Sequence, residues 1–188
     1  MQGEKLSEIL TPTETHHGVF EERVVAASRT DRADAYKRMI RSAFAAKKSV
    51  YVVAPTIRSV EYWAKELSKG IQKHVLVLHS KTTKKNLRSA FAQLKTSDRP
   101  LLVFVTPGFF LVPRADLGFI IAEDEGSSLY KTIDRYSADL RILIRSVAEH
   151  AGLTLTWGDT MPRLETLARL GADHLPRTYV PKKVHVVP

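Results

Sequence analysis

The sequence contains no cysteine among its 188 residues. This absence excludes disulfide bonds and cysteine-ligated zinc within the chain, and it is compatible with a reducing compartment. No stretch approaches the roughly 20 apolar residues of a membrane span. The N-terminal residues are polar and of mixed charge, so they lack the apolar core of a signal peptide. These absences predict a cytoplasmic protein without membrane contact.

Acidic residues are outnumbered by basic ones. Lys and Arg total 29 against 20 Asp and Glu, which gives a net charge of +9 and an isoelectric point near 9.8. A folded domain this basic is a candidate for binding nucleic acid, and the alternative is a basic surface that serves solubility. The length and the 44% hydrophobic content are sufficient for one domain with a substantial core.

Apolar, β-rich runs alternate along the chain with segments whose apolar residues have helical spacing. The predicted strands cover residues 24–27, 50–54, 75–78, 101–105, 117–122 and 153–157. Strands that are apolar on both faces and separated by amphipathic helices indicate a parallel sheet covered on both sides. The sequence therefore predicts an α/β fold, a three-layer α/β/α domain with a mainly parallel sheet.

The predicted domain covers residues 23–175. Residues 1–22 lack clear periodicity and are expected to form an N-terminal arm or linker. Residues 176–188 are expected to form a C-terminal linker that leads to a further domain. Within the domain, Gly70 and Gly171 follow helical segments and are predicted to end them.

Three consecutive acids follow the predicted strand 117–122, namely Glu123, Asp124 and Glu125. Parallel sheets bind ligands beyond the carboxyl ends of their strands. In nucleoside triphosphatases, acids at such a strand end hold magnesium and orient water. The alternative, which the sequence favours, is a solvated strand end whose acids pair with Lys131 or Arg135.

Five segments of the chain keep an order and spacing that point to one family. They are residues 77–80 (Val-Leu-His-Ser), 116–121 (Asp-Leu-Gly-Phe-Ile-Ile), 128–131 (Ser-Leu-Tyr-Lys), 135–136 (Arg-Tyr) and 162–167 (Pro-Arg-Leu-Glu-Thr-Leu). From about Val24 to Leu175 the chain resembles the first helicase lobe of primosomal protein N′, the replication-restart DNA helicase of bacteria. The resemblance implies a RecA-like, P-loop NTPase-like lobe. It also implies ATP and magnesium as cofactors, and forked or single-stranded DNA and other replication-restart proteins as partners.

The phosphate-binding loop departs from the family pattern Gly-x-Thr-Gly-Ser-Gly-Lys-Thr. In that loop the glycines let backbone N–H groups surround the phosphates, Lys reaches the phosphates, and Thr binds magnesium. Here Arg29, Thr30, Asp31, Arg32 and Ala33 occupy the matching positions, and no glycine remains. Asp31 brings a negative charge toward the phosphates, Arg32 is not a conservative replacement for Lys, and Ala33 cannot bind a metal.

Three further motifs depart from the family in parallel. Residues 123–126 read Glu-Asp-Glu-Gly in place of Asp-Glu-Glu-His, residues 159–162 read Asp-Thr-Met-Pro in place of Ser-Ala-Thr-Pro, and residues 105–108 read Val-Thr-Pro-Gly in place of Gly-Thr-Arg-Ser. We therefore expect no ATP hydrolysis by the family's mechanism, no bound nucleotide or metal ion, and only a vestigial acidic motif. Two alternatives stay open: an active ATP-dependent DNA helicase lobe with an atypical phosphate loop, and a protein-interaction lobe without DNA contact.

Basic and polar residues follow other predicted strands and are candidates for DNA binding. They are Arg58, Lys81, Lys84, Lys85, Arg88 and Thr106. The lysines either neutralise DNA phosphates or form an ordinary solvated helix face. Arg58 and Thr106 stand where helicase lobes of the family meet the single-strand backbone, although Pro107 replaces the family's Arg.

Overall fold

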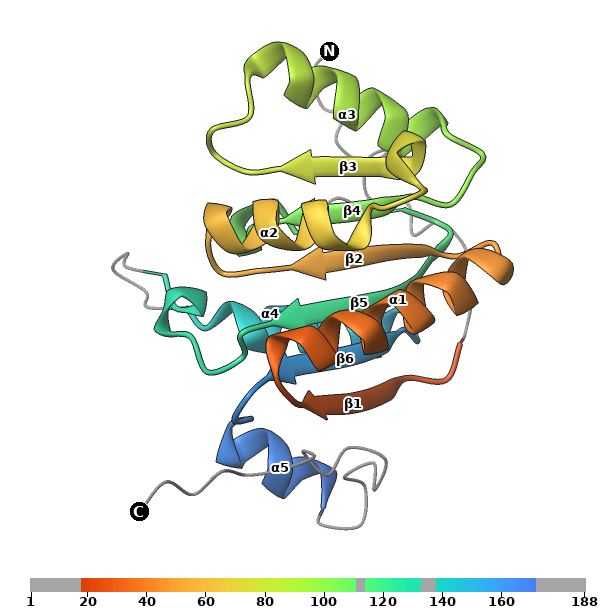
Figure 1. Cartoon of the computed structure of the whole chain (residues 1–188). Coiled ribbons are helices and arrows are strands. Elements are labelled where there is room, and N and C mark those ends of the chain that lie inside the picture. Colours follow the sequence, from red (N-terminus) through yellow and green to blue (C-terminus); the bar gives the residue numbers. More distant parts are fainter. Residues whose placement is uncertain (1–17, 111–113, 133–137, 172–188) are drawn as a thin grey trace, which may run out of the picture.

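A computed structural model of the chain describes residues 18–110, 114–132 and 138–171 (Figure 1). The strands are β1 (Glu21–Ala26), β2 (Ser49–Val53), β3 (Val75–Leu78), β4 (Leu102–Val105), β5 (Leu117–Glu123) and β6 (Thr154–Asp159). The α-helices are α1 (Arg29–Ala45), α2 (Ile57–Leu67), α3 (Lys84–Thr96), α4 (Leu140–His150) and α5 (Leu164–Leu170). Three short 3-10 helices complete the described elements: η1 (Gln72–His74), η2 (Pro107–Phe109) and η3 (Ser128–Tyr130).

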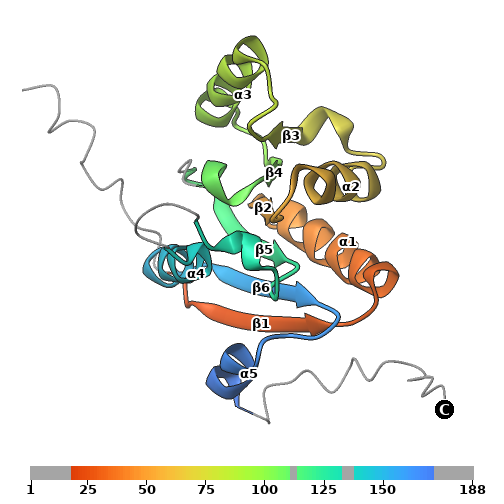
Figure 2. The same ribbon diagram turned by 90° about the vertical axis from the view of Figure 1, so that its left-hand side faces the viewer.

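The six strands form one sheet in the order β1-β6-β5-β2-β4-β3, and all five pairings are parallel. Figure 2 shows α1 and α2 on one face of this sheet and α4 on the other. The predicted three-layer α/β/α fold with a parallel sheet is therefore confirmed.

Each face of the sheet has its own apolar core. All five residues of β2 are buried, and so are all four residues of β4. One core packs α1 and α2 against the sheet, and there the rings of Tyr36 and Trp63 meet edge to face with centroids 5.2 Å apart. The other core takes in Ala90 and Leu94 of α3 and Ile144 of α4. Burial of each such large apolar side chain contributes roughly 1.5–3 kcal/mol, which explains why the central strands are continuously apolar.

Helices α1, α2 and α3 each begin shortly after a strand ends, at the carboxyl edge of the sheet. Ser28, Thr56 and Thr83 are their N-cap residues, and each side chain accepts a hydrogen bond from the backbone N–H three residues later. Such caps satisfy donors that have no partner within the helix. The caps therefore fix the first turn of each helix at the edge where ligands of parallel sheets bind.

Several element boundaries differ from the prediction. β1 begins at Glu21 rather than at Val24, because an edge strand can extend through polar residues that alternate out to solvent. Helix α2 ends with Ser68 as its C-cap, so the prediction that Gly70 ends it was wrong, although Gly70 has φ +86° in the turn that follows. Gly171 does end α5, with φ 73°. Residues 1–17 and 172–188 lie outside the described part, so the predicted arm and linker stay predictions.

Candidate functional site

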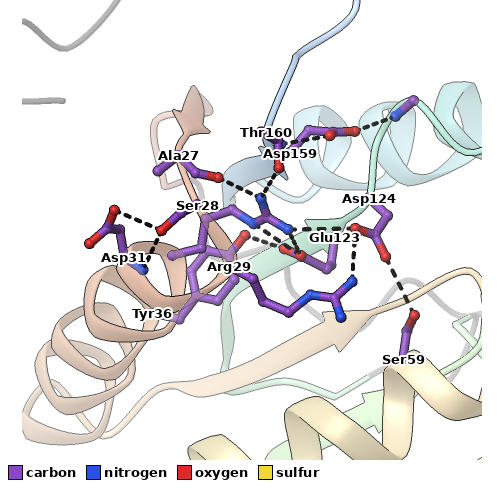
Figure 3. A network of polar contacts seen from close by, with 12 residues as sticks. Ala27, Ser28, Arg29, Asp31, Tyr36, Ser59, Glu123, Asp124, Asp159 and Thr160 are labelled. Atoms are coloured by element: carbon purple, nitrogen blue, oxygen red, sulfur yellow. Dashed lines mark hydrogen bonds and ion pairs between the residues drawn. The ribbon is translucent and has the colours of Figure 1, made fainter. Parts of the chain in front are cut away.

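The predicted phosphate-loop segment and the acidic segment meet at the carboxyl edge of the sheet. Arg29–Ala33 follows β1 and Glu123–Glu125 ends or follows β5, with β6 between these two strands. The sequence order separates the two segments by about 90 residues, and the strand order brings them together. Figure 3 shows the resulting network of polar contacts, in which Glu123 meets Tyr36 and Asp124 meets Arg29, both from the first helix.

The centre of this network is a buried ion pair between Arg32 and Glu123. The exposed fraction of the side chain is 2% for Arg32 and 0% for Glu123. The Arg32 Nε donates to Oε1 of Glu123 at 3.0 Å, and Nη2 donates to the same oxygen. Nη1 donates to the carbonyl of Ala27 at 2.6 Å and to Oγ1 of Thr160 at 3.1 Å. One guanidinium thus connects the chain segments that follow β1, β5 and β6.

Tyr36 satisfies the second oxygen of the same carboxylate. It lies one turn after Arg32 on α1, so both side chains leave the same helix face. Its hydroxyl donates to Oε2 of Glu123 at 2.5 Å. Gly158 of β6 lies directly against this hydroxyl, and a Cβ at that position would overlap both the Tyr36 hydroxyl and Oε2 of Glu123. Only glycine therefore leaves room for the tyrosine to reach the carboxylate.

Burial dominates the ionisation of this network. It raises the pKa of Glu123 to about 7, although the hydrogen bonds from Arg32 and Tyr36 act in the opposite direction. Burial alone would lower the pKa of Arg32, but the hydrogen bond and charge of Glu123 outweigh it and raise that pKa. Burial likewise raises the pKa of the Tyr36 hydroxyl well above its usual range. Arg32 therefore stays charged, and the carboxyl group takes up its proton near neutral pH.

Asp124 lies beside the buried pair and is partly open to solvent. Its φ is 52°, in the left-handed region that Asp adopts more readily than most residues. The carboxylate is 27% exposed and lies 3.5 Å from Nη2 of Arg32 and 4.0 Å from Nη2 of Arg29. It also accepts a hydrogen bond of 3.4 Å from the hydroxyl of Ser59 on α2 (Figure 3). Asp124 is therefore the acid of the three that still reaches solvent.

Glu125 is buried in a separate contact. Its carboxylate accepts hydrogen bonds from Oγ1 of Thr166 and from the backbone N–H of Arg163 at 3.3 Å, and burial raises its pKa. The predicted solvated strand end was wrong, since both flanking acids of the triplet are about 1% exposed or less. The predicted pairing with Lys131 was wrong as well, because Arg32 and Thr166 hold these carboxylates, and Arg135 lies outside the described residues.

The segment predicted as a degenerate phosphate loop forms the first turn of α1. Ser28 caps this turn, and its hydroxyl also donates to Oδ2 of Asp31 at 2.8 Å. Arg29 is half-exposed, with its guanidinium 5.1 Å from the ring centroid of Tyr62. Thr30 is exposed, whereas Ala33 is buried in the core beneath α1 and α2. Asp31 therefore contributes to the cap of α1, and its negative charge stabilises the N-terminus of the helix.

The predicted DNA-binding residues lie along the other half of the same edge. They follow β2, β3 and β4, which are neighbours at one end of the sheet order. Arg58, Lys81, Lys84 and Lys85 are exposed, and Thr106 is half-buried with its backbone N–H bonded to the carbonyl of Leu78 at 3.3 Å. The fold thus collects these residues at one part of the sheet edge, in loops and in the first turns of α2 and α3, and their role in DNA binding stays a prediction.

Three members of the network were missed by sequence reasoning. Tyr36 has the spacing of a core residue on a helix, and nothing in the sequence links it to Glu123. Thr160 belongs to a segment noted only for its departure from the family, and Gly158 immediately precedes that segment. The spacing of four residues between Arg32 and Tyr36 was the one available signal, because it places both on one helix face.

Across residues 18–110, 114–132 and 138–171, no group of three or more His, Asp or Glu side chains is arranged to hold a metal ion. The helices in this described part are all too short or too polar to cross a bilayer.

No protein-family model matches the chain, and no curated protein matches it. Among solved structures, the chain is similar to the C-terminal part of the Fun30 ATPase domain, with a TM-score of 0.46, 10% identity, and coverage of 71% of this chain and 46% of that one. It is also similar to Mss116p DEAD-box helicase domain 2 bound to an RNA duplex, with a TM-score of 0.47, 12% identity, and coverage of 79% and 67%. The chain spans under half the length of the first structure, and both similarities concern the fold alone.

Proposed function

We propose that this chain is a helicase-like lobe of a primosomal protein N′ homologue that does not hydrolyse ATP and that serves DNA binding or scaffolding in replication restart. The family assignment rests on the five sequence segments that resemble the first helicase lobe. The observation that carries the loss of ATP hydrolysis is the buried ion pair between Arg32 and Glu123.

Arg32 stands at the position of the family's phosphate-binding Lys, and its donors are already used. Its guanidinium is bonded to Glu123, Ala27 and Thr160 within the protein. A phosphate that entered would have to separate the buried pair, and breaking such a pair costs about 3–5 kcal/mol. At about 1.4 kcal/mol per tenfold, this cost weakens nucleotide affinity by about 100- to 4,000-fold.

Two of the three acids at residues 123–125 are not available as magnesium ligands. Glu123 is enclosed by Arg32 and Tyr36, and Glu125 by Thr166 and Arg163. Asp124 alone is accessible, and it faces two guanidinium groups. Magnesium in such sites is bound by one or two carboxylates together with substrate phosphates, so the residues present do not fit a magnesium–nucleotide complex.

DNA binding is supported by the exposed basic residues on the neighbouring half of the edge. Arg58 lies in the first turn of α2, after β2, and Lys84 and Lys85 lie in the first turn of α3, after β3; β4 separates these two strands. Cations gathered at one edge of the sheet can neutralise the phosphates of one stretch of DNA backbone. The lobe therefore keeps a surface for DNA beside a nucleotide site closed by its own side chains.

Isothermal titration calorimetry with ATP and magnesium tests the first part of the proposal, and fluorescence anisotropy with labelled DNA across a salt series tests the second. We expect no ATP binding at millimolar concentration and DNA binding that weakens steeply with salt. Tight ATP binding with turnover would refute the inactive lobe and favour an active motor. Absence of DNA affinity even at low salt would refute the DNA-binding role and favour a lobe that binds only proteins.

A further inference from the structure

The positive charge of the protein is concentrated in one segment. Residues 67–97 contain no Asp or Glu and seven Lys or Arg: Lys69, Lys73, Lys81, Lys84, Lys85, Arg88 and Lys95. The rest of the chain has 22 basic residues against all 20 acids, so these 31 residues carry seven of the nine net charges. A basic surface that served only solubility would have acids and bases interspersed. The exclusion of acids from this segment indicates an anionic partner.

This segment forms one end of the domain. β3 is the last strand of the sheet order, and α3 lies beside it at the top of Figures 1 and 2. Ala90 and Leu94 of α3 are buried toward the core, whereas the four basic residues of the helix are exposed. At 3.6 residues per turn, Lys84, Arg88 and Lys95 fall within about 40° of one another around the helix axis. They form a row about 16 Å long.

Within the part of the chain that the structure describes, no ion pair neutralises the cations of the row. Among the ion pairs of the described residues, Lys69 pairs with Glu66, and none involves a basic residue of α3. Lys84 and Arg88 are four residues apart on one helix face, where like charges repel and weaken the helix. A polyanion along this face would remove that repulsion.

We propose that Lys81, Lys84, Lys85, Arg88 and Lys95 bind the phosphate backbone of double-stranded DNA along α3. This inference rests on the proposed function and deepens it, because it names the duplex as the form of DNA and an entire helix as the surface. One strand of B-DNA has a phosphate about every 3.4 Å of axis, so a row of 16 Å spans about five phosphates.

The choice of duplex over single strand follows from the lack of exposed aromatic rings on α3. Proteins that bind single strands combine basic grooves with aromatic side chains on which bases stack. Phe91, the aromatic residue of α3, packs partly buried against the core. The exposed large apolar residues of the described part include Tyr62 on α2 and none on α3. The surface thus provides phosphate contacts without base contacts, which suits a stacked duplex of any sequence.

Five phosphate contacts predict a definite dependence on salt. The logarithm of the association constant falls with the logarithm of salt concentration with a slope of about −4.5 for five contacts. Affinity for a 20-base-pair duplex should accordingly fall about 500-fold between 50 and 200 mM salt. Neutralising three of the five cations should reduce the slope to about −1.8.

The experiment measures binding of the full chain to a labelled 20-base-pair duplex and to a single strand of the same length by fluorescence anisotropy. The test variant carries Lys84→Gln, Arg88→Gln and Lys95→Gln. We expect at least tenfold weaker duplex binding at 50 mM salt and the smaller salt slope. A second variant with Lys84→Arg, Arg88→Lys and Lys95→Arg keeps the charges and should bind as the unchanged protein does.

The matched control carries Arg38→Gln, Arg41→Gln and Lys65→Gln. These three basic residues are exposed on α1 and α2, and their replacement removes the same net charge as the test variant. The control should keep duplex affinity within about threefold, since it removes no phosphate contact. Equal losses in both triple variants, unchanged binding in the α3 variant, or preference of the unchanged protein for the single strand would each overturn the inference. Absence of any DNA binding by the unchanged protein would overturn the proposed DNA role as well.

Discussion

Replacement of Arg32 by Ala is the most direct perturbation of the closed site. It removes the hydrogen bonds that the guanidinium donates to Glu123, Ala27 and Thr160, and it leaves a buried carboxyl group without its cation. Because Arg32 is 2% exposed, solvent does not screen the pair. We expect a loss of about 3–5 kcal/mol in the free energy of unfolding. For a domain of this size, that corresponds to a melting temperature lower by about 6–20 °C.

A double-mutant cycle separates the pair from the individual side chains. Glu123→Gln keeps an acceptor for Arg32 but removes the compensating charge, and we expect it to cost less than Arg32→Ala. The combined replacement Arg32→Met with Glu123→Leu removes both charges and fills the space with apolar groups. Since well-packed apolar residues often replace buried ion pairs without loss, we expect its stability to lie within about 1 kcal/mol of the unchanged protein or above it.

The assay is urea unfolding followed by circular dichroism. An unchanged m-value, the slope of the free energy of unfolding against urea concentration, shows that only stability has changed. Arg38→Ala is the matched control, because Arg38 is exposed on the same helix, and it should change the free energy of unfolding by no more than about 0.5 kcal/mol. A loss below about 1 kcal/mol for Arg32→Ala, or a cycle without coupling, would refute the reasoning that this pair holds the edge of the sheet together.

Gly158→Ala should destabilise the protein by about 1–3 kcal/mol in thermal unfolding, because the new Cβ overlaps the hydroxyl of Tyr36; adding Tyr36→Phe should recover part of this loss. The folded-state pKa of Glu123, about 7, lies above its ordinary value of 4.5, so the folded state holds an extra proton between these pH values. Stability from this group therefore falls as pH rises through about 7, by at most about 1.4 kcal/mol per pH unit, and Glu123→Gln should flatten the pH profile of unfolding by that amount. Asp124→Gly should keep or raise stability, since φ is 52° there, whereas Asp124→Val should lower it by at least about 1 kcal/mol in the same assay; equal effects would contradict the backbone argument.

The strands and helices were readable from the sequence because their signals are local. The apolar run at residues 50–54 predicted a strand of the parallel sheet, and all residues of β2 are buried. Val60, Trp63 and Leu67 have helical spacing, and all three are buried on α2. The first three residues of β1, 21–23, could not be predicted as strand, because a polar residue such as Glu22 extends an edge strand only where other elements bind its side chain. Here Arg145, Arg169 and Trp157 bind the Glu22 carboxylate.

The sequence placed the three acids correctly at an edge of the sheet, but the prediction that they are exposed to solvent was wrong for Glu123 and Glu125. Glu123, Asp124 and Glu125 were assigned to the carboxyl end of a strand, where the structure has them. Their burial could not be deduced, because a run of acids normally indicates solvent. Glu123 can be buried because Arg32 at the start of α1 and the hydroxyl of Tyr36 one turn later bind its carboxylate, and both residues come from a distant part of the chain.

The sequence by itself determined the class of fold and the absence of glycine from residues 29–33, since both depend on residue type and spacing along the chain. The tertiary structure decided the strand order β1-β6-β5-β2-β4-β3, and with it the pairing of Arg32 with Glu123 across 91 positions. The same order gathers the acid-free segment at one end of the sheet. Strand order follows from how complete helices and strands bury their apolar faces against one another, and no local pattern encodes it.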